Sequence, residues 1–175
     1  LYGRLNGNFL LKHFSLESIK EILKDHGLTS NNDLLFFYSI FEGVPFYYNY
    51  ISERGGYKKS KEDFFNEDIL DESSILINEG REILVEEFGK DYSIYFSILE
   101  AVARGGTTMS RISDISGINV NNLGRYLSEL IEDHELIERN APFDSKKSSK
   151  MGRYYIKDNF LDFWFRYIFK NRSRI

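Results

Sequence analysis

Apolar side chains recur every three or four positions between residues 16 and 51, a spacing that predicts three amphipathic helices. Ser15 precedes the first helix as an N-cap, and Gly27 follows it in the position of a terminating glycine. The second helix is expected to be capped by Asn31 or Asn32, and the third to start at Pro45, because the first turn needs no amide hydrogen there. We expect the three helices to form a compact bundle.

The pattern continues through a charged loop at 53–61 and a short helix over 63–70. A longer helix is expected to begin after Ser73 or Ser74 and to stop at Gly89. We expect this long helix to connect two domains.

From residue 91 onward the apolar spacing predicts three more helices, followed by two short strands. In chain order we expect a helix that ends at Gly105, a second helix capped by Thr107 or Thr108, a turn at 117–119, a third helix over 120–133, and strands at 136–139 and 153–157. This order is that of a winged helix, in which a β-hairpin follows a helix-turn-helix. The fold class is therefore expected to be mainly α, with a helical bundle followed by a winged-helix domain carrying a small β-hairpin.

Charge and composition narrow the function classes. Residues 136–175 hold ten basic and four acidic side chains, although the whole chain has a net charge of −4. This basic end suits a phosphate backbone, or it is simply a solvated surface. The chain has no Cys, no long apolar run and no leader pattern, so we expect a cytoplasmic protein without disulfides or a membrane span. The three His lack metal-ligand spacing, so no metal site is expected.

The helix expected over 120–133 is the predicted recognition helix for duplex DNA. Asn and Arg side chains match adenine and guanine edges in the major groove, and Lys and Arg match phosphates. The expected DNA-binding residues are Arg111, Asn119, Asn121, Asn122 and Arg125, with Lys146, Lys147, Lys150 and Arg153 in the wing. The later half of the helix is acidic through Glu129, Glu132 and Asp133, which disfavours phosphate. An internal switch therefore stands beside DNA binding as an alternative.

Four pieces of the chain, in this order, resemble the archaeal and bacterial P-loop ATPases of the AAA-like STAND group. They are Leu-Tyr-Gly-Arg at 1–4, Glu-Gly-Val-Pro-Phe-Tyr-Tyr at 42–48, the helix-turn-helix, and the aromatic run at 154–166. The second piece is similar to the family's Gly-Gly-Val-Pro-Tyr-Tyr-Leu, with Glu42 in place of a glycine. The resemblance implies a helical lid over 1–89, a winged helix over 90–158 and the start of a further domain at 159–175, all within a larger protein.

The resemblance also implies site residues. Gly43 and Pro45 would lie against adenine, and Arg4 would reach the γ-phosphate. The alternatives are that Pro45 only begins a helix and that Arg4 is a solvated chain end. ATP and Mg²⁺ would belong to the parent ATPase, whose N-terminal nucleotide-binding core would be a partner of this chain. No Gly-x-x-x-x-Gly-Lys-Ser/Thr occurs, so the chain alone should not hydrolyse ATP and no catalytic residue is expected in it.

The aromatic segment that starts at Phe160 is expected to be mostly core. Without its further domain, Trp164 and its neighbours are expected to be exposed and to allow self-association. The competing hypothesis for the whole chain is a non-enzymatic winged-helix transcriptional regulator, whose N-terminal helices only mediate protein contacts.

Overall fold

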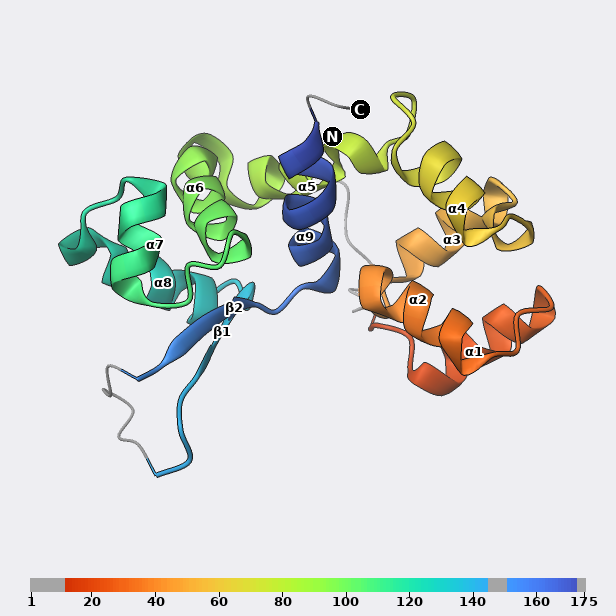
Figure 1. The fold of residues 1–175 in the computed structure, drawn as a ribbon, viewed down its shortest axis with the longest axis horizontal. Coiled ribbons are helices and arrows are strands. Elements are labelled where there is room, and N and C mark those ends of the chain that lie inside the picture. The colour runs from red at the N-terminus through yellow and green to blue at the C-terminus, as the bar shows by residue number, and fades with distance from the viewer. Residues whose placement is uncertain (1–11, 145–150, 173–175) are drawn as a thin grey trace, which may run out of the picture. The chain divides into compact units, whose positions relative to one another are not determined.

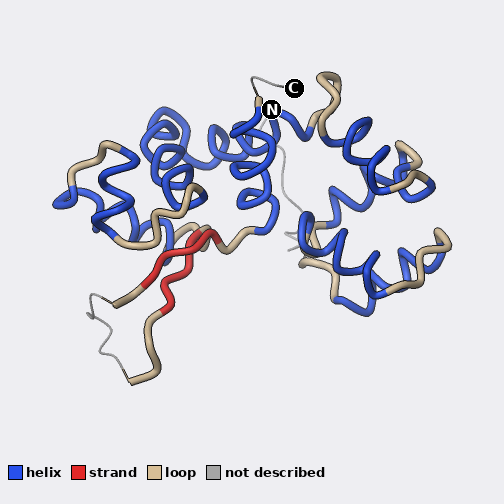
Figure 2. The backbone as a smooth tube through the Cα atoms, viewed as in Figure 1, coloured by secondary structure: helices blue, strands red, loops and turns tan. Residues whose placement is uncertain are grey.

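The computed structural model describes residues 12–144 and 151–172, and this part of the chain is mainly helical with one antiparallel β-hairpin (Figures 1 and 2). It divides into two compact units, residues 1–59 and residues 60–175. This boundary differs from the one expected at 89 and 90. Residues 60–89 belong to the second unit because the long helix that they contain packs against the aromatic segment near the C-terminus.

The first unit consists of α1 (Leu16–Asp25), α2 (Asn31–Phe41), α3 (Pro45–Glu53) and a 3₁₀ turn (Gly56–Lys58). Ser15 caps α1 as predicted, since its Oγ accepts a hydrogen bond from the amide of Ser18. The cap of α2 is Ser30, one residue before the expected asparagines. Its Oγ accepts from the amide of Asp33 and donates to the Asp33 carboxylate, so two groups of the first turn are satisfied at once.

Aromatic side chains dominate the core of the first unit, and two of its tyrosines bond the backbone inside it. The buried apolar residues are Ile19, Leu23, Phe37, Ile40, Phe41, Tyr47, Tyr48, Ile51 and Tyr57. The Tyr57 hydroxyl donates to the carbonyl oxygen of Tyr48 across 3.0 Å, and the His26 ring stacks on Tyr57. Burial raises the pKa of both Tyr48 and Tyr57. The expected loop at 53–61 therefore contributes a buried aromatic to the core.

Besides two 3₁₀ turns (Gly89–Asp91 and Phe169–Asn171), the second unit holds the remaining α-helices and both strands. They are α4 (Lys61–Phe64) with its π-helical continuation (Phe65–Ile69), α5 (Leu76–Phe88), α6 (Tyr92–Ala103), α7 (Met109–Ser116), α8 (Val120–Glu132), β1 (Ile137–Asn140), β2 (Arg153–Ile156), and α9 (Asn159–Phe163) with its π-helical continuation (Trp164–Ile168). Thr108 caps α7, and Gly117 ends it with a φ of 74°. The order of α6, α7, α8 and the hairpin is the one that the sequence predicts.

Trp164 anchors the aromatic segment to α5 and is completely buried. Its indole nitrogen donates to the carbonyl oxygen of Ile77, and its ring lies directly on Gly80. The expectation that Trp164 is exposed is therefore wrong, because α5 and α6 supply the surface that a further domain was expected to supply. Tyr167 remains 58% exposed.

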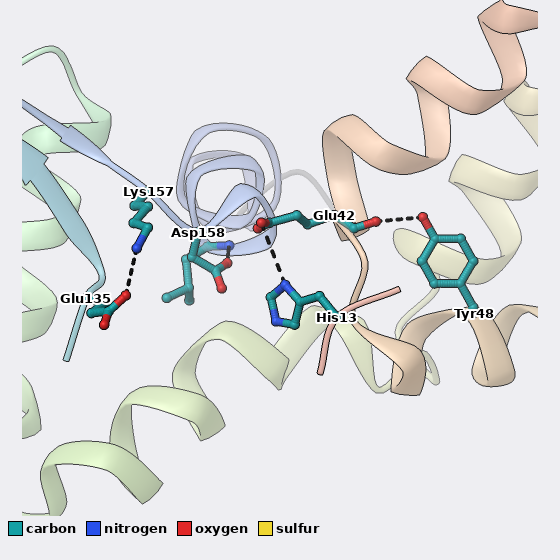
Figure 3. Close-up of polar contacts among 7 residues, drawn as sticks. His13, Glu42, Tyr48, Glu135, Lys157 and Asp158 are labelled. Atoms are coloured by element: carbon teal, nitrogen blue, oxygen red, sulfur yellow. Dashed lines mark hydrogen bonds and ion pairs between the residues drawn. The ribbon is translucent and has the colours of Figure 1, made fainter. Parts of the chain in front are cut away.

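The two strands of the hairpin pair antiparallel, with Ile137 opposite Ile156 and Asn140 opposite Arg153. The amide of Tyr154 donates to the carbonyl oxygen of Thr107, which ties β2 to the loop before α7. Between α8 and β1, Glu135 accepts a hydrogen bond from Lys157 across 2.8 Å (Figure 3), and this bond lowers the pKa of Glu135. The hairpin is thus fixed to the three helices at its base.

Candidate functional site

The start of α8 presents a row of polar side chains to solvent. Asn121, Asn122 and Arg125 are exposed, and their spacing of three and four residues makes them neighbours on the helix surface. The face of α8 that packs inward carries Leu123, Leu127 and Leu130. The structure therefore brings together the predicted base-reading residues at one end of one helix.

Asn119 has a structural role in addition to the predicted one. It is the N-cap of α8, and its side-chain oxygen accepts a hydrogen bond from the amide of Asn121 across 2.9 Å. The residue is exposed, so its amide group still faces solvent. Arg111 lies on α7, one turn after Thr108, and is also exposed.

Arg125 is oriented by a chain of contacts that begins within α8 and continues to α6. Its Nε lies 3.1 Å from Oε1 of Glu129, and its guanidinium lies over the Tyr126 ring. The other oxygen of Glu129 accepts a hydrogen bond from the hydroxyl of Tyr95 on α6. Burial, and then this bond, raise the pKa of Tyr95 to about 12. Tyr95 and Glu129 are 34 residues apart, so no local pattern could reveal the pair.

A second set of contacts joins Tyr95 to the end of α5. The Phe88 ring stacks on Tyr95 with 3.9 Å between the centroids, and His134 lies against both rings. Nδ1 of His134 is 2.6 Å from Oε1 of Glu87. The same aromatic cluster thus contacts α5, α6 and the residues that follow α8.

The described part of the wing carries two arginines. Arg153 is exposed on β2, and its guanidinium bonds the carbonyl oxygens of Met151 and Gly152. Arg139 lies over the Tyr154 ring, and its guanidinium passes so close to Gly152 that a Cβ there would overlap it. Arg139 was not predicted as a site residue, although its position opposite Tyr154 in the ladder follows from the strand register. Lys146, Lys147 and Lys150 lie outside the described residues.

The turn between α2 and α3 contains the predicted adenine-binding residues. Glu42 has a φ of 49° and a ψ of −122°, a backbone conformation that glycine adopts far more readily. The Tyr48 hydroxyl donates to its carbonyl oxygen across 2.7 Å, and Nδ1 of His13 lies 3.6 Å from its carboxylate (Figure 3). The departure from the resembled family's glycine thus falls where the backbone favours one.

Gly43 is buried and permits a close approach between backbones. The amide of Phe14 donates to its carbonyl oxygen across 2.7 Å, and a Cβ on Gly43 would come within 2.4 Å of the Phe14 carbonyl oxygen. Gly43 is therefore fixed by packing against Phe14.

Pro45 is partly exposed and occupies the first turn of α3, where its missing amide hydrogen costs no helical bond. Phe46 beside it is half exposed, so an apolar surface is present at the start of this helix. Arg4 lies outside the described residues, so the contact between Arg4 and a γ-phosphate stays a prediction.

Within 12–144 and 151–172, no group of three or more His, Asp or Glu side chains is placed to hold a metal ion. Among the helices of the same residues, none combines the length and apolar character needed to cross a bilayer.

Comparison with known proteins identifies a relative of the chain. Over all of its 175 residues the chain is 35% identical to the uncharacterized protein MJECL04 of Methanocaldococcus jannaschii. It spans 37% of the length of that protein. No family model matches the chain. No solved structure matches it.

Proposed function

We propose that residues 60–175 bind duplex DNA through the start of α8 and the wing. The observation that carries this proposal is the exposed cluster of Asn121, Asn122 and Arg125 at the N-terminal end of α8, whose other face is packed against its unit. Asn pairs with adenine and Arg with guanine in the major groove, which a helix of this kind enters with its N-terminal end. The arginines at 111 and 153 add exposed positive charge for phosphates.

The sequence of the wing supports the same function. Five basic residues and one acidic residue occur between Arg139 and Arg153 inclusive, which gives this hairpin the charge that a phosphate backbone attracts. The acidic residues in the later half of α8 limit the proposal to a shallow entry, with the N-terminal end of the helix nearest the DNA.

We propose further that the chain belongs to a P-loop ATPase, in which the first unit is part of the lid over adenine. Pro45 supplies a rigid apolar face, and the buried Gly43 and the unusual backbone at Glu42 fix its direction. The relative's greater length leaves room for a nucleotide-binding core in a protein of this kind. ATP and Mg²⁺ would then be held by that core, and this chain alone would not turn over ATP.

An internal switch is the second function that a specific observation favours. Tyr95, Glu129 and Arg125 form a chain of contacts from α6 to the predicted recognition face, and Phe88 extends it to α5. In a nucleotide-dependent protein such contacts would pass a movement of α5 to α8. A non-enzymatic regulator would need the DNA interface but not the lid.

The DNA proposal is tested by a mobility-shift titration of the 175-residue chain on duplex DNA at low salt. Binding should weaken as salt rises, and joint replacement of Lys146, Lys147 and Lys150 by Ala should flatten the slope of log affinity against log salt by roughly two to three units. If about 100 micromolar protein does not retard the duplex, the DNA proposal fails and the internal switch is favoured.

The lid proposal has a separate test in the protein that carries this chain. Its sequence should contain a phosphate-binding loop, and Pro45→Ala should weaken nucleotide binding more than it lowers the melting temperature. Unchanged nucleotide affinity would make Pro45 only a helix starter.

A further inference from the structure

Phe143, in the turn that follows β1, is fully exposed, with 102% of its reference surface accessible to water. Single exposed apolar side chains are common on proteins, but this one is accompanied by two others on the same hairpin. Met151 is 56% exposed and Tyr155 is 41% exposed. The ring of Phe143 gains nothing from the fold in the described residues, so its apolar surface is available for a partner.

The alternation of the strands places part of this surface on one face. Arg153 and Tyr155 point to the same side of β2, and both are exposed, whereas Tyr154 between them is buried. An exposed face that combines an arginine with an aromatic side chain, in a hairpin with a large excess of basic residues, is complementary to a nucleic acid. An acidic phosphate backbone with apolar base faces beneath it offers both kinds of contact.

We propose that Phe143 is a wedge that enters the minor groove of duplex DNA, partly unstacks one base step and bends the duplex. The proposal rests on the DNA-binding function proposed above and assigns the wing a role beyond phosphate contact. Proteins that use apolar wedges in this way unstack a step at a cost of a few kcal/mol and bend the duplex by about 20–90°. Arg153 would hold the phosphate beside the opened step, and Tyr155 would lie along the sugar edge.

The test measures binding and bending separately with the full 175-residue chain. A duplex of about 25 base pairs, rich in flexible TA steps, carries a donor dye at one end and an acceptor at the other. Titration should raise energy transfer as the ends approach, and anisotropy of the same duplex should give the affinity. Phe143→Ala should lose the gain in energy transfer and weaken binding about tenfold, as expected when one base loses its aromatic contact. Its salt slope should equal that of the wild type, because no charge is removed.

Matched variants separate the wedge from other effects. Phe143→Leu should retain part of the bend, since leucine is also an apolar wedge. Arg153→Ala should flatten the salt slope by about 0.9 per lost phosphate contact. Tyr167→Ala removes an exposed aromatic outside the wing and should change neither signal.

Any of the following outcomes would contradict the proposal that Phe143 is a wedge. Binding without a change in energy transfer, or with Phe143→Ala equal to the wild type, rejects the wedge and leaves the DNA-binding function standing. Failure of the wild type to bind any duplex rejects both. A dimer in sedimentation that Phe143→Ala converts to a monomer, without an effect on bending, assigns the ring to contact between copies of the chain.

Discussion

The indole nitrogen of Trp164 donates a hydrogen bond to the backbone carbonyl oxygen of Ile77, 87 residues earlier, across 3.0 Å. The ring reaches this depth because Gly80 has no side chain: a Cβ there would lie 2.3 Å from Cδ2 of Trp164. Gly80→Ala should therefore destabilise the second unit by about 1–3 kcal/mol through overpacking, although alanine favours an exposed helix by about 1 kcal/mol. Urea unfolding followed by tryptophan fluorescence measures this, because the chain has one Trp.

Gly124→Ala is the matched control for Gly80→Ala. It lies within α8, and its added Cβ would meet only Cε of Met109, at 3.7 Å. This variant should gain up to about 1 kcal/mol from helix propensity alone. Equal effects of the two substitutions would contradict overpacking of Trp164 as the cause of the loss.

Glu42→Gly should stabilise the first unit, because Glu42 has a backbone conformation that costs a non-glycine residue about 1–3 kcal/mol. The extra entropy of an unfolded glycine removes about 1 kcal/mol of that gain, and the long contact with His13 contributes little at the surface. A net increase of roughly 1 kcal/mol is expected in thermal unfolding. Glu21→Gly, in the exposed interior of α1, should instead lose about 1 kcal/mol. A loss of stability in Glu42→Gly would show that the carboxylate matters more than the strain.

The sequence predicted those features of the fold that depend on neighbouring residues. Ser15 and Thr108 cap their helices as expected, because each side chain accepts a hydrogen bond from an amide within the first turn. Pro45 begins α3 as expected, because its ring needs no amide hydrogen there. Ser30 was missed in favour of the next two asparagines, and the choice depends on the reach of its hydroxyl to Asp33. Cap chemistry thus locates a helix start to within a residue.

Contacts between distant segments were not predictable in the same way. Because Trp164 packs on Gly80, α5 belongs to the second unit and not to the expected lid. The residues next to Trp164 and Gly80 in the sequence do not indicate this contact. In the candidate site, periodicity correctly predicted that Asn121, Asn122 and Arg125 are exposed. Arg125 pairs with Glu129 one turn later on the same helix, a spacing that is visible in the sequence. The hydrogen bond from Tyr95 of α6 to Glu129 is the contact that depends on tertiary packing.

Tyr95→Phe should lower the free energy of unfolding by about 1 kcal/mol at neutral pH, since the hydroxyl bonded to Glu129 is lost. The pKa of Tyr95 in the folded protein is raised to about 12, whereas a tyrosine in the unfolded chain has a pKa of about 10. The contribution of Tyr95 is thus fully present below pH ~10 and is lost as the pH rises through ~12. Tyr48 and Tyr57 are present in both the wild type and Tyr95→Phe, so their titration cancels in the difference between the two unfolding free energies. Urea unfolding of both proteins at several alkaline pH values should show the gap closing, and a gap independent of pH would contradict the hydrogen bond.

Arg125→Ala should reduce the sequence preference of DNA binding by about 1–3 kcal/mol at one base position. Arg125 contacts Glu129 through Nε, so the two terminal nitrogens keep their hydrogens for the O6 and N7 atoms of a guanine. Arg125→Lys should lose the same preference, because a lysine cannot bond both atoms in one plane. Glu129→Gln should keep the shape of the contact but weaken its hold on the guanidinium, so the preference should fall while non-specific affinity rises with the loss of a negative charge. Selection from a randomised duplex library, followed by competition titrations at fixed salt, measures both quantities. If all three variants bind DNA with the preference of the wild type, α8 does not read bases through Arg125.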